Sequence, residues 1–487
     1  MKRIVLLLCL FLVASGLIFA GSQGEATGDK KIVRMYPQGL APREAMETDR
    51  IAPPKAFWEV QKEYEQLNPN VQIEFLENLP SGYEEWFSTQ MTGGTAPEIV
   101  WYQRGYIQRD YQKGWLSSLS NELDNTANPY TPGNKAWYDI FQEPVIESGR
   151  APNDEIYMIT GDIVGTGIFY NKDIFAEVGV EVPETWDDFL QVQAKVKSAG
   201  YIPFSISMAL GGGIELWGSW TTRELQDVFY NDKMEYLKGG PVERTWKPGQ
   251  NLPTQDMVKA IKDGRYSAKD EEFKEIFLTM KEWSQYWPEG YWALPSDDVF
   301  PLWIQGKAAM GWFGSWLNKS INNDPLREFE WGVFEKLPTI TKASSEFGGS
   351  PFPAMAGVGG VFQYAISEQT TTEFDNFAET VDWMKYITNP ETLIKLLNDH
   401  GGFAPGTKVT TGADPTLSIY TDQMVKYGTE RIEPFDSMLT REFYDNFWKL
   451  IQQYLGDQID IEKLTDEIQK EFEEGADQLL AENPDWK

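Results

Sequence analysis

The sequence is short of the residues that carry covalent and metal chemistry. Its 487 residues include one cysteine, Cys9, and one histidine, His400. A lone cysteine forms no intramolecular disulfide, and a lone histidine argues against a Ser-His-Asp triad or a histidine metal centre. The motifs GxSxG, HExxH and the phosphate-binding P-loop are absent as well. We therefore expect no catalytic residues, no metal site and no cofactor.

Positive charge is also scarce. The chain has 43 Lys and Arg residues against 74 Asp and Glu, which gives a formal net charge of −31 at pH 7. An acidic surface of this size repels the phosphates of nucleic acids and anionic lipid head groups. This argues against both as partners, and we interpret the charge as a means of keeping an exported protein soluble.

Long apolar runs are missing after the first 20 residues, so we expect no direct insertion of the remainder into a membrane. The first 20 residues have a positive start at Lys2 and Arg3, an apolar stretch over 4–13 and a small-residue close. This is the layout of a secretory signal peptide, with cleavage after Ala20. The alternative is an uncleaved anchor, because residues 4–20 are almost wholly apolar, although they only reach the minimum span of about 17 residues.

Cysteine is absent from the place where lipid attachment would need it. Gly21 follows the predicted cleavage site, and Cys9 lies in the segment that cleavage removes. Without a lipobox, the mature protein is expected to be free in the periplasm or outside the cell. Residues 21–30 are small and polar, and we interpret them as a flexible lead-in.

Aromatic residues, in contrast, are plentiful: 19 Trp, 22 Tyr and 27 Phe. The mean hydropathy is −0.44, and a chain this polar is not expected to bury all of these rings. The chain also exceeds the length of about 250–300 residues at which a single hydrophobic core stops growing. Two lobes, with rings left over for a binding surface, are therefore the default expectation.

The hydrophobic pattern alternates between strands and helices. Residues 31–36 and 71–75 have the composition of strands, and between them a helix is predicted from a 3-4-3 spacing of apolar residues at Phe57, Val60, Tyr64 and Leu67. Residues 83–102 and 183–207 repeat the order of helix, glycine turn and strand. Residues 460–483 place apolar side chains on one stripe of a surface helix. These units predict an α/β protein with parallel strands.

Six blocks of the sequence, in order over residues 31–482, resemble a known family. They are GGTAPEIVWY, GIFYNKDIFAEVGVEVPETWDDFLQVQAKVKSAG, GKAAMGWFGSW, GVGGVFQYAIS, WMKYITNPETLIKLL and the C-terminal stripe. The chain is identified by them as similar to the family 1 extracellular solute-binding proteins of ABC importers, of which maltose-binding proteins are familiar members.

The resemblance implies the two-lobed α/β fold of type II periplasmic binding proteins, with a ligand cleft between lobes joined by a hinge. By matching blocks, lobe one is expected to hold 31–160 plus 362–428, and lobe two 161–361 plus 429–487. The fold agrees with the general rule that open α/β sheets bind ligands beyond the carboxyl ends of their strands.

A sugar has apolar C–H faces and a rim of hydroxyl groups, so its site needs aromatic rings together with carboxylates, amides or arginine. The residues that match such positions are Tyr102, Gln103, Arg104, Asp162, Glu215, Trp217, Trp220, Trp316, Gly360 and Phe443. We expect Tyr102 to be a stacking ring, with Gln103 or Arg104 as hydroxyl partners. The alternative is that Tyr102 caps the core and Arg104 pairs with a surface acid.

The other candidates also have structural alternatives. Asp162 lies where the first crossover reaches the cleft, but it is two residues out of step with the family, and it could instead bond the backbone of a turn. Glu215, Trp217 and Trp220 follow three adjacent glycines that we interpret as a ligand loop. The alternative is a helix N-terminus with both rings buried.

The block GKAAMGWFGSW divides into two parts. We expect Trp312 and Phe313 to lie in a buried strand and Trp316 to be the stacking ring that the resemblance implies. Gly360 would let the backbone approach the ligand and the hinge move, and Phe443 falls near another stacking position. The segment HGGFAPG, from His400, is interpreted as structural.

The sequence therefore predicts the binding component of an ABC importer, which captures a carbohydrate by hinge closure and delivers it to a membrane permease. A monomer is expected. The main alternative, a secreted glycoside hydrolase, needs two carboxylates facing each other across a bond, roughly 5–9.5 Å apart. Asp297 and Asp298 are a poor pair for this, because neighbours on a strand point to opposite faces. A ligand-sensing ectodomain or adaptor with the same cleft is the third possibility.

Overall fold

The computed structural model describes residues 30–47, 49, 52–76, 83–237, 252, 254–352, 356–427, 432, 435 and 438–486. The predicted signal peptide (1–20) and the predicted lead-in (21–30), apart from its last residue, lie outside these ranges. Within the described ranges, no helix combines the length and apolar character that a membrane span requires.

The first sheet has five strands in the order β2-β1-β3-β10-β4. Its strands are β1 (Lys31–Met35), β2 (Val71–Phe75), β3 (Ile99–Trp101), β4 (Met158–Thr160) and β10 (Gln363–Ile366). β1 runs parallel to β2 and β3, whereas β10 is antiparallel to both of its neighbours. The predicted parallel arrangement is confirmed for β1 and β2, and a strand from late in the chain completes the sheet.

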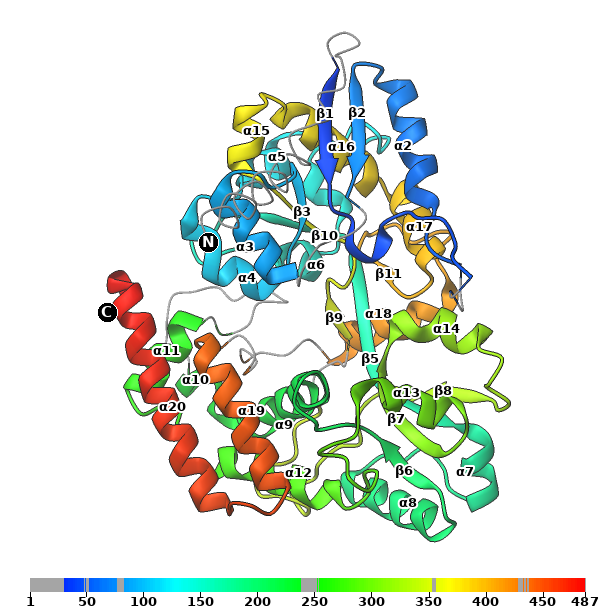
Figure 1. Cartoon of the computed structure of the whole chain (residues 1–487), viewed down its shortest axis with the longest axis vertical. Coiled ribbons are helices and arrows are strands. Elements are labelled where there is room, and N and C mark those ends of the chain that lie inside the picture. The colour runs from blue at the N-terminus through cyan, green and yellow to red at the C-terminus, as the bar shows by residue number, and fades with distance from the viewer. Residues whose placement is uncertain are drawn as a thin grey trace, which may run out of the picture.

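Helices cover this sheet in the upper half of Figure 1. They are α2 (Ala56–Leu67), α3 (Tyr83–Gly93), α4 (Arg104–Asp110), α5 (Ser120–Asn125), α6 (Glu143–Glu147), α15 (Glu368–Glu373), α16 (Phe377–Thr388) and α17 (Pro390–His400). The predicted apolar face of α2 is confirmed at Phe57, Val60 and Tyr64, which are buried, but not at Leu67, which ends the helix 63% exposed.

The second sheet has the strand order β11-β5-β7-β6, with two further strands paired to β5. Its strands are β5 (Asp162–Asn171), β6 (Ile202–Ser205), β7 (Ala308–Gly314), β8 (Trp331–Val333), β9 (Ala356–Val358) and β11 (Ala404–Pro405). All seven residues of β7 are buried. The prediction that Trp312 and Phe313 are core residues is therefore confirmed.

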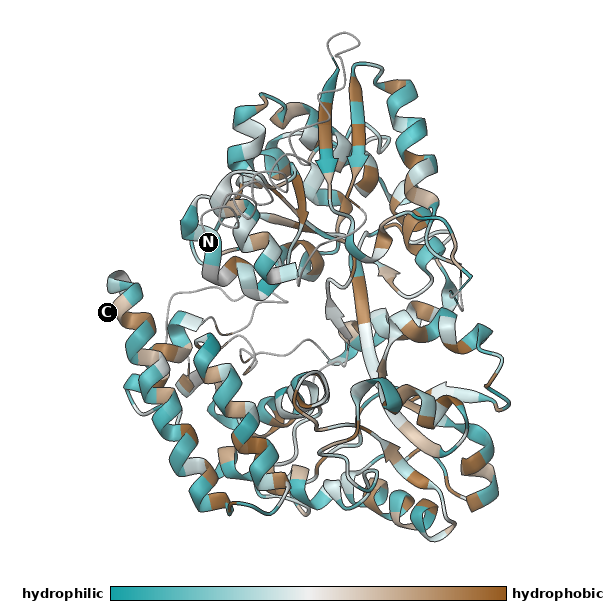
Figure 2. Ribbon diagram, in the orientation of Figure 1, coloured by the Kyte–Doolittle hydropathy of each residue, from teal (hydrophilic) through white to brown (hydrophobic). Residues whose placement is uncertain are grey.

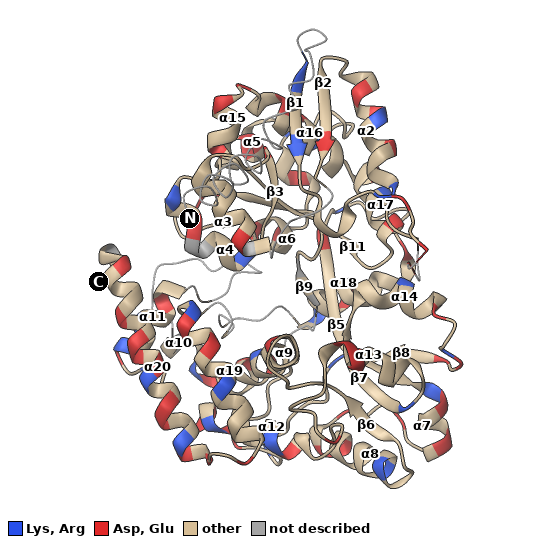
Figure 3. Cartoon of the chain, in the orientation of Figure 1, with Lys and Arg blue, Asp and Glu red and all other residues tan. Residues whose placement is uncertain are grey.

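The remaining helices of the described chain lie around the second sheet, in the lower half of Figure 1. They are α7 (Lys172–Val178), α8 (Trp186–Ser198), α9 (Ser219–Phe229), α10 (Met234–Leu237), α11 (Thr254–Lys262), α12 (Glu271–Ser284), α13 (Ser296–Ile304), α14 (Asn318–Asn323), α18 (Ser418–Tyr427), α19 (Arg441–Leu455) and α20 (Ile461–Glu482). Figure 2 shows alternating polar and apolar faces on α19 and α20, and Figure 3 shows charges of both signs interspersed along them. The predicted C-terminal stripe is confirmed, because Leu464, Ile468, Phe472 and Ala476 are buried.

Strand β5 connects the two halves of the molecule (Figure 1). Its first residues pair with β9 and β11, and its last residues pair with β7 and β8. Buried apolar residues around the first sheet come from 33–159 and 361–403, whereas those around the second come from 168–352 and 432–486. The lobe boundaries given above stay a prediction.

Candidate ligand-binding cleft

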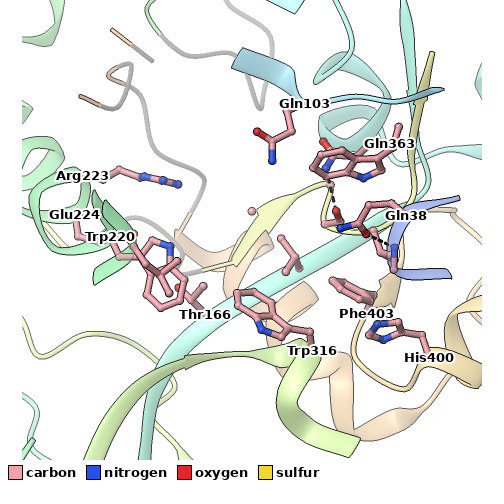
Figure 4. A pocket seen from close by; sticks show the side chains of 18 residues that line it. Gln38, Gln103, Thr166, Trp220, Arg223, Glu224, Trp316, Gln363, His400 and Phe403 are labelled. Atoms are coloured by element: carbon pink, nitrogen blue, oxygen red, sulfur yellow. Dashed lines mark hydrogen bonds between the residues drawn. The ribbon is translucent and has the colours of Figure 1, made fainter. Parts of the chain in front are cut away.

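A cavity of about 600 Å³ lies beside β5, between residues from the two halves of the chain. This volume is within the range of roughly 300–1,000 Å³ found for small-molecule sites. The cavity is lined by Gln38, Gly39, Trp101, Gln103, Val164, Thr166, Leu216, Trp220, Arg223, Glu224, Trp316, Gly357, Gly359, Gly360, Val361, Gln363, His400 and Phe403. Figure 4 shows their side chains converging on the same space.

The wall from the first sheet carries three amides and one indole. Trp101 ends β3, Gln103 follows it, and Gln38 follows β1 in a 3-10 turn. Because β1 and β3 are parallel, their carboxyl ends meet at one edge of the sheet. Gln363 begins β10 and completes this wall. Each amide offers both donors and an acceptor, which suits a rim of hydroxyl groups.

The opposite wall is one face of α9 and of the π-helical turn before it. Leu216, Trp220, Arg223 and Glu224 line the cavity, and their spacing of four, three and one places them on one helical face. Arg223 donates from Nη2 to the Ser219 hydroxyl over 3.4 Å. This wall adds one ring and one group of each charge.

The floor consists of packed rings. Trp316 lies with its ring over Gly314, where a Cβ atom would come within 2.1 Å of the indole. The Trp316 and Trp220 ring centroids are 6.0 Å apart at 63°. Phe403 packs against His400 at 4.7 Å between centroids. Two cavity-lining indoles, Trp220 and Trp316, therefore meet edge to face at the floor.

Among the sequence-predicted residues, Gln103, Trp220, Trp316 and Gly360 line the cavity. Figure 4 labels three of them, and their side chains point into the same space from different elements. The structure thus brings these four together, and their contact with a ligand stays a prediction.

Tyr102 and Arg104 lie elsewhere. Tyr102 is fully buried, and its hydroxyl donates to Asp110 over 2.7 Å. Side chains alternate along an extended strand, so Trp101 and Gln103 face the cavity while Tyr102 between them faces the core. Arg104 begins α4 and does not line the cavity. For Tyr102, the structure supports the alternative of a core position.

Asp162 is placed beneath the cavity wall instead of in it. Its side chain is fully buried and accepts backbone hydrogen bonds of 3.0 Å each from Gly360, Val361 and Phe362. Burial raises the pKa of the carboxyl to about 6, although the three backbone donors act in the opposite direction. The carboxylate therefore supports the wall from behind, as in the alternative that it bonds the backbone.

Glu215 and Trp217 are also structural in this arrangement. The Glu215 carboxylate accepts from the backbone nitrogens of Gly211 and Gly212 at 2.9 and 2.8 Å. Both glycines have positive φ, 88° and 135°, so the turn itself explains the glycine run. Trp217 is buried and donates from Nε1 to the Trp312 carbonyl over 2.8 Å. Of the three residues predicted on this loop, only Trp220 lines the cavity.

Phe443 lies in the core around the second sheet and is not among the residues that line the cavity. Its side chain is 1% exposed on α19, and its ring stacks on Phe472 of α20 at 5.5 Å. The prediction that Phe443 lies near a stacking position does not fit this placement, because Phe443 is on the buried apolar face of α19.

Sequence reasoning missed several lining residues, notably Gln38, Arg223, Gln363, His400 and Phe403. Arg223 could have been found from its helical spacing after Trp220. His400 and Phe403 belong to the segment interpreted as structural, and the structure adds that both residues line the cavity. No sequence periodicity marks Gln38, which has a left-handed φ of 55° in its turn.

Metal ligands do not cluster in the part of the chain that the structure describes, where no group of three or more His, Cys, Asp or Glu side chains could hold an ion. The described residues of the cavity lining offer amides, aromatic rings, the Thr166 hydroxyl and one charged group of each sign. The cavity can bind a polar ligand that has flat apolar faces.

Comparison with known proteins extends these observations. A family model of bacterial extracellular solute-binding proteins matches residues 48–392. The multiple sugar-binding protein of Streptococcus mutans is 23% identical over 256 residues, which cover 48% of this chain and 54% of that protein. The chain spans about half the length of the curated relatives it matches.

Solved structures share the fold over nearly the whole chain. The ligand-free form of RafE from Streptococcus pneumoniae has a TM-score of 0.62 at 19% identity, covering 91% of this chain and 98% of its own. A sugar transporter from Bacillus licheniformis in complex with stachyose has a TM-score of 0.55 at 14% identity, covering 90% and 98%. At these identities the likeness shows the fold alone, and it confirms the predicted type II binding-protein architecture.

Proposed function

This chain belongs to the bacterial extracellular solute-binding protein family, and on that premise we propose that its cavity binds an oligosaccharide for delivery to the membrane permease of an ABC importer. Family membership also confirms the prediction that the chain is a binding protein and not an enzyme. The ligand and the permease are the parts that the proposal adds.

The observation that carries the proposal is the arrangement of rings and amides around one cavity. Trp101 comes from the end of β3, Trp220 from α9 and Trp316 from the 3-10 turn after β7. Indole faces stack on the C–H faces of sugar rings, while Gln103 and Gln363 can bond their hydroxyls. A peptide site would instead need a charged pocket for a terminus, and a polyamine site several acids; among the described residues of this lining, Glu224 is the single acid.

The names of several relatives support a ligand of more than one sugar ring. The Streptococcus mutans relative is called a multiple sugar-binding protein, and structures with the same fold hold raffinose in RafE and stachyose in the Bacillus licheniformis protein. We extend this class of ligand to the present chain as a proposal. Its acidic composition is compatible with a neutral sugar and disfavours a polyanion.

The proposal includes the route by which the protein works. We infer that residues 1–20 direct export to the periplasm or the cell exterior, and that the monomer closes about the segments near β5 when a sugar binds. Closure would exclude water and strengthen the hydrogen bonds inside the cavity.

A thermal-shift screen tests the proposal. Raffinose, stachyose, galactose and a chitin oligosaccharide are compared with a peptide and a polyamine, followed by calorimetry on any hit. A bound sugar stabilises the folded state by mass action, by about 2.7 kcal/mol at a hundredfold excess over Kd. A shift with the peptide or the amine and none with any sugar would contradict the substrate class. Cleavage of a sugar during the assay would contradict the binding role.

A further inference from the structure

The only histidine of the chain lies in the cavity wall and was not expected there. We propose that His400 is a specificity-determining residue, whose imidazole donates a hydrogen bond from Nε2 to an oxygen of the bound sugar. This inference rests on the proposed function of the cavity. It adds that the His400 side chain determines which sugars bind.

The ring of His400 is held firmly in place. His400 is the last residue of α17, which ends at Gly401 with a φ of 77°. Its ring packs on Phe403 at 4.7 Å and 57° between planes. Phe403 is itself held against Gly360, where an added Cβ would come within 2.4 Å of the ring. A side chain fixed in this way keeps its donor pointing in one direction.

The two ring nitrogens have different surroundings. Nδ1 is buried and has no hydrogen-bond partner. Nε2 is not among the buried unpartnered atoms, and within the described residues it takes part in no hydrogen bond, so it is the nitrogen left to face the cavity. Gly39, which also lines the cavity, is the neighbour of this nitrogen: a Cβ atom built there would stand 3.8 Å from Nε2, an ordinary contact distance.

The position of the ring proton follows from this difference. Neutral imidazole has one N–H donor and one acceptor nitrogen. A buried N–H without an acceptor is rare in proteins and costs more than an acceptor with an unused lone pair. The proton is therefore placed on Nε2, where a ligand oxygen or water can accept it.

Burial, more than the surrounding charges, keeps the ring neutral. Burial, and next Lys319, lower the pKa of His400 to about 4, with Asp399 acting in the opposite direction. Lys319 donates from Nζ to the Asp399 carbonyl at 2.8 Å, and the Asp399 carboxylate accepts from the backbone nitrogens of Lys55 and Ala56 at 2.6 and 2.8 Å. Asp399 thus has other partners, and the imidazole acts as a neutral donor near pH 7.

A fixed neutral donor distinguishes sugars by their hydroxyl groups. A ligand that places an oxygen opposite Nε2 pairs with the N–H, whereas an epimer or deoxy sugar leaves it desolvated and unpaired. Sites that bond a hydroxyl in this way reject analogues that lack it far more strongly than apolar pockets do. The Gln363 amide is oriented by the hydrogen bond that its Nε2 donates to the Gly360 carbonyl over 3.2 Å, whereas the Gln103 amide can present either its oxygen or its nitrogen, so His400 is a more selective group than Gln103.

Because His400 is the only histidine, labelling it gives a single imidazole signal set. Protein without a histidine tag, grown with nitrogen-15 histidine, is expected to show the neutral ring with the proton on Nε2 at pH 7 before any sugar is added. An Nδ1-protonated ring would overturn the inference without reference to a ligand. On saturation with raffinose or stachyose, followed in parallel by tryptophan fluorescence, the Nε2 signal should move more than the Nδ1 signal.

Two variants separate ligand contact from packing. His400→Phe keeps a ring against Phe403 but removes the donor, and it should weaken the tightest sugar of the panel about tenfold or more. It should also reduce the ratio of affinities between that sugar and its weaker epimers. His400→Gln keeps a donor and should retain more of both. Thermal stability without ligand should not fall in His400→Phe, because a buried unpartnered nitrogen is replaced by carbon.

Unchanged affinity ratios in His400→Phe, or imidazole signals that do not move while fluorescence reports binding, would overturn the inference and leave the proposed function standing. Failure of every sugar to bind the wild-type protein would instead refute the proposed function. In that case the tautomer measured without ligand still decides whether Nε2 carries the proton that the geometry assigns to it.

Discussion

The carboxylate of Asp162 accepts a hydrogen bond of 3.0 Å from the backbone nitrogen of Gly360, which stands 198 residues later in the sequence. The same carboxylate accepts from Val361 and Phe362, so one side chain holds three successive peptide units. Asp162 begins β5 and Gly360 lines the cavity between β9 and β10. A buried anion therefore ties together two of the segments that run between the sheets.

Replacing Asp162 with alanine should lower the free energy of unfolding by roughly 2 kcal/mol or more at pH 7, because it leaves buried backbone donors without an acceptor. Urea unfolding measures this change. Asp187→Ala is the control, because this substitution also removes an aspartate carboxylate, but from an exposed position in the first turn of α8. Equal effects of the two substitutions would contradict the role given to Asp162.

The same pair of proteins tests the titration of Asp162. Burial raises the folded-state pKa to about 6 from an ordinary value of 3.8, so the folded protein binds this proton more tightly than the unfolded chain does. The stability that Asp162 contributes is then full below about pH 4 and is lost as the pH rises through about 6. The stability difference between wild type and Asp162→Ala should grow by up to about 3 kcal/mol from pH 7 to pH 4.

His400 titrates in the opposite sense over the same range. Its folded-state pKa is lowered to about 4 from 6.5, so its contribution is lost as the pH falls. For this reason the wild-type pH curve alone does not isolate Asp162, and the difference from the variant does. A difference that stays constant between pH 4 and pH 7 would contradict the raised pKa of Asp162.

Two tryptophans four residues apart should respond differently to truncation. Trp316→Ala should weaken sugar binding by roughly 1–3 kcal/mol, the energy of stacking on one ring, with a smaller effect on stability. Trp312→Ala should instead destabilise the fold by roughly 3–5 kcal/mol, because the ring is 1% exposed and its Nε1 donates to Thr166 over 3.0 Å. Calorimetry and urea unfolding of both variants measure the two effects. Trp292→Ala, which removes a half-exposed ring outside the cavity lining, controls for the loss of an indole.

The burial of Trp312 was predictable from local sequence, whereas the place of Trp316 was expected from the family resemblance. The apolar run before Gly314 predicts a buried strand that contains Trp312, and β7 does end at this glycine. Trp316 follows the strand and is therefore outside it. The choice among Trp101, Tyr102 and Gln103 was not predictable in the same way. A strand of a parallel sheet is buried on both faces, so its alternation does not tell which face meets the ligand.

The places of His400 and Phe403 depend on contacts that no local pattern encodes. Ala404 and Pro405 pair with Ile163 and Asp162 at the start of β5, about half of the chain away. This pairing carries the end of α17 against the cavity. Its strand is two residues long, too short for periodicity to reveal it.

The two cavity glycines Gly360 and Gly357 provide a final prediction. Gly360→Ala would place a Cβ atom 2.4 Å from the Phe403 ring and 3.0 Å from Val164, so the ring must move or the strand must shift, and we expect a loss of stability of about 1–3 kcal/mol. Gly357→Ala is the matched control, since its Cβ would meet no atom within 4 Å. Its stability should be unchanged or slightly raised, because alanine loses less backbone entropy on folding. Urea unfolding decides between them, and an equal loss in both variants would mean that backbone freedom, and not the packing of Phe403 on Gly360, is what position 360 requires.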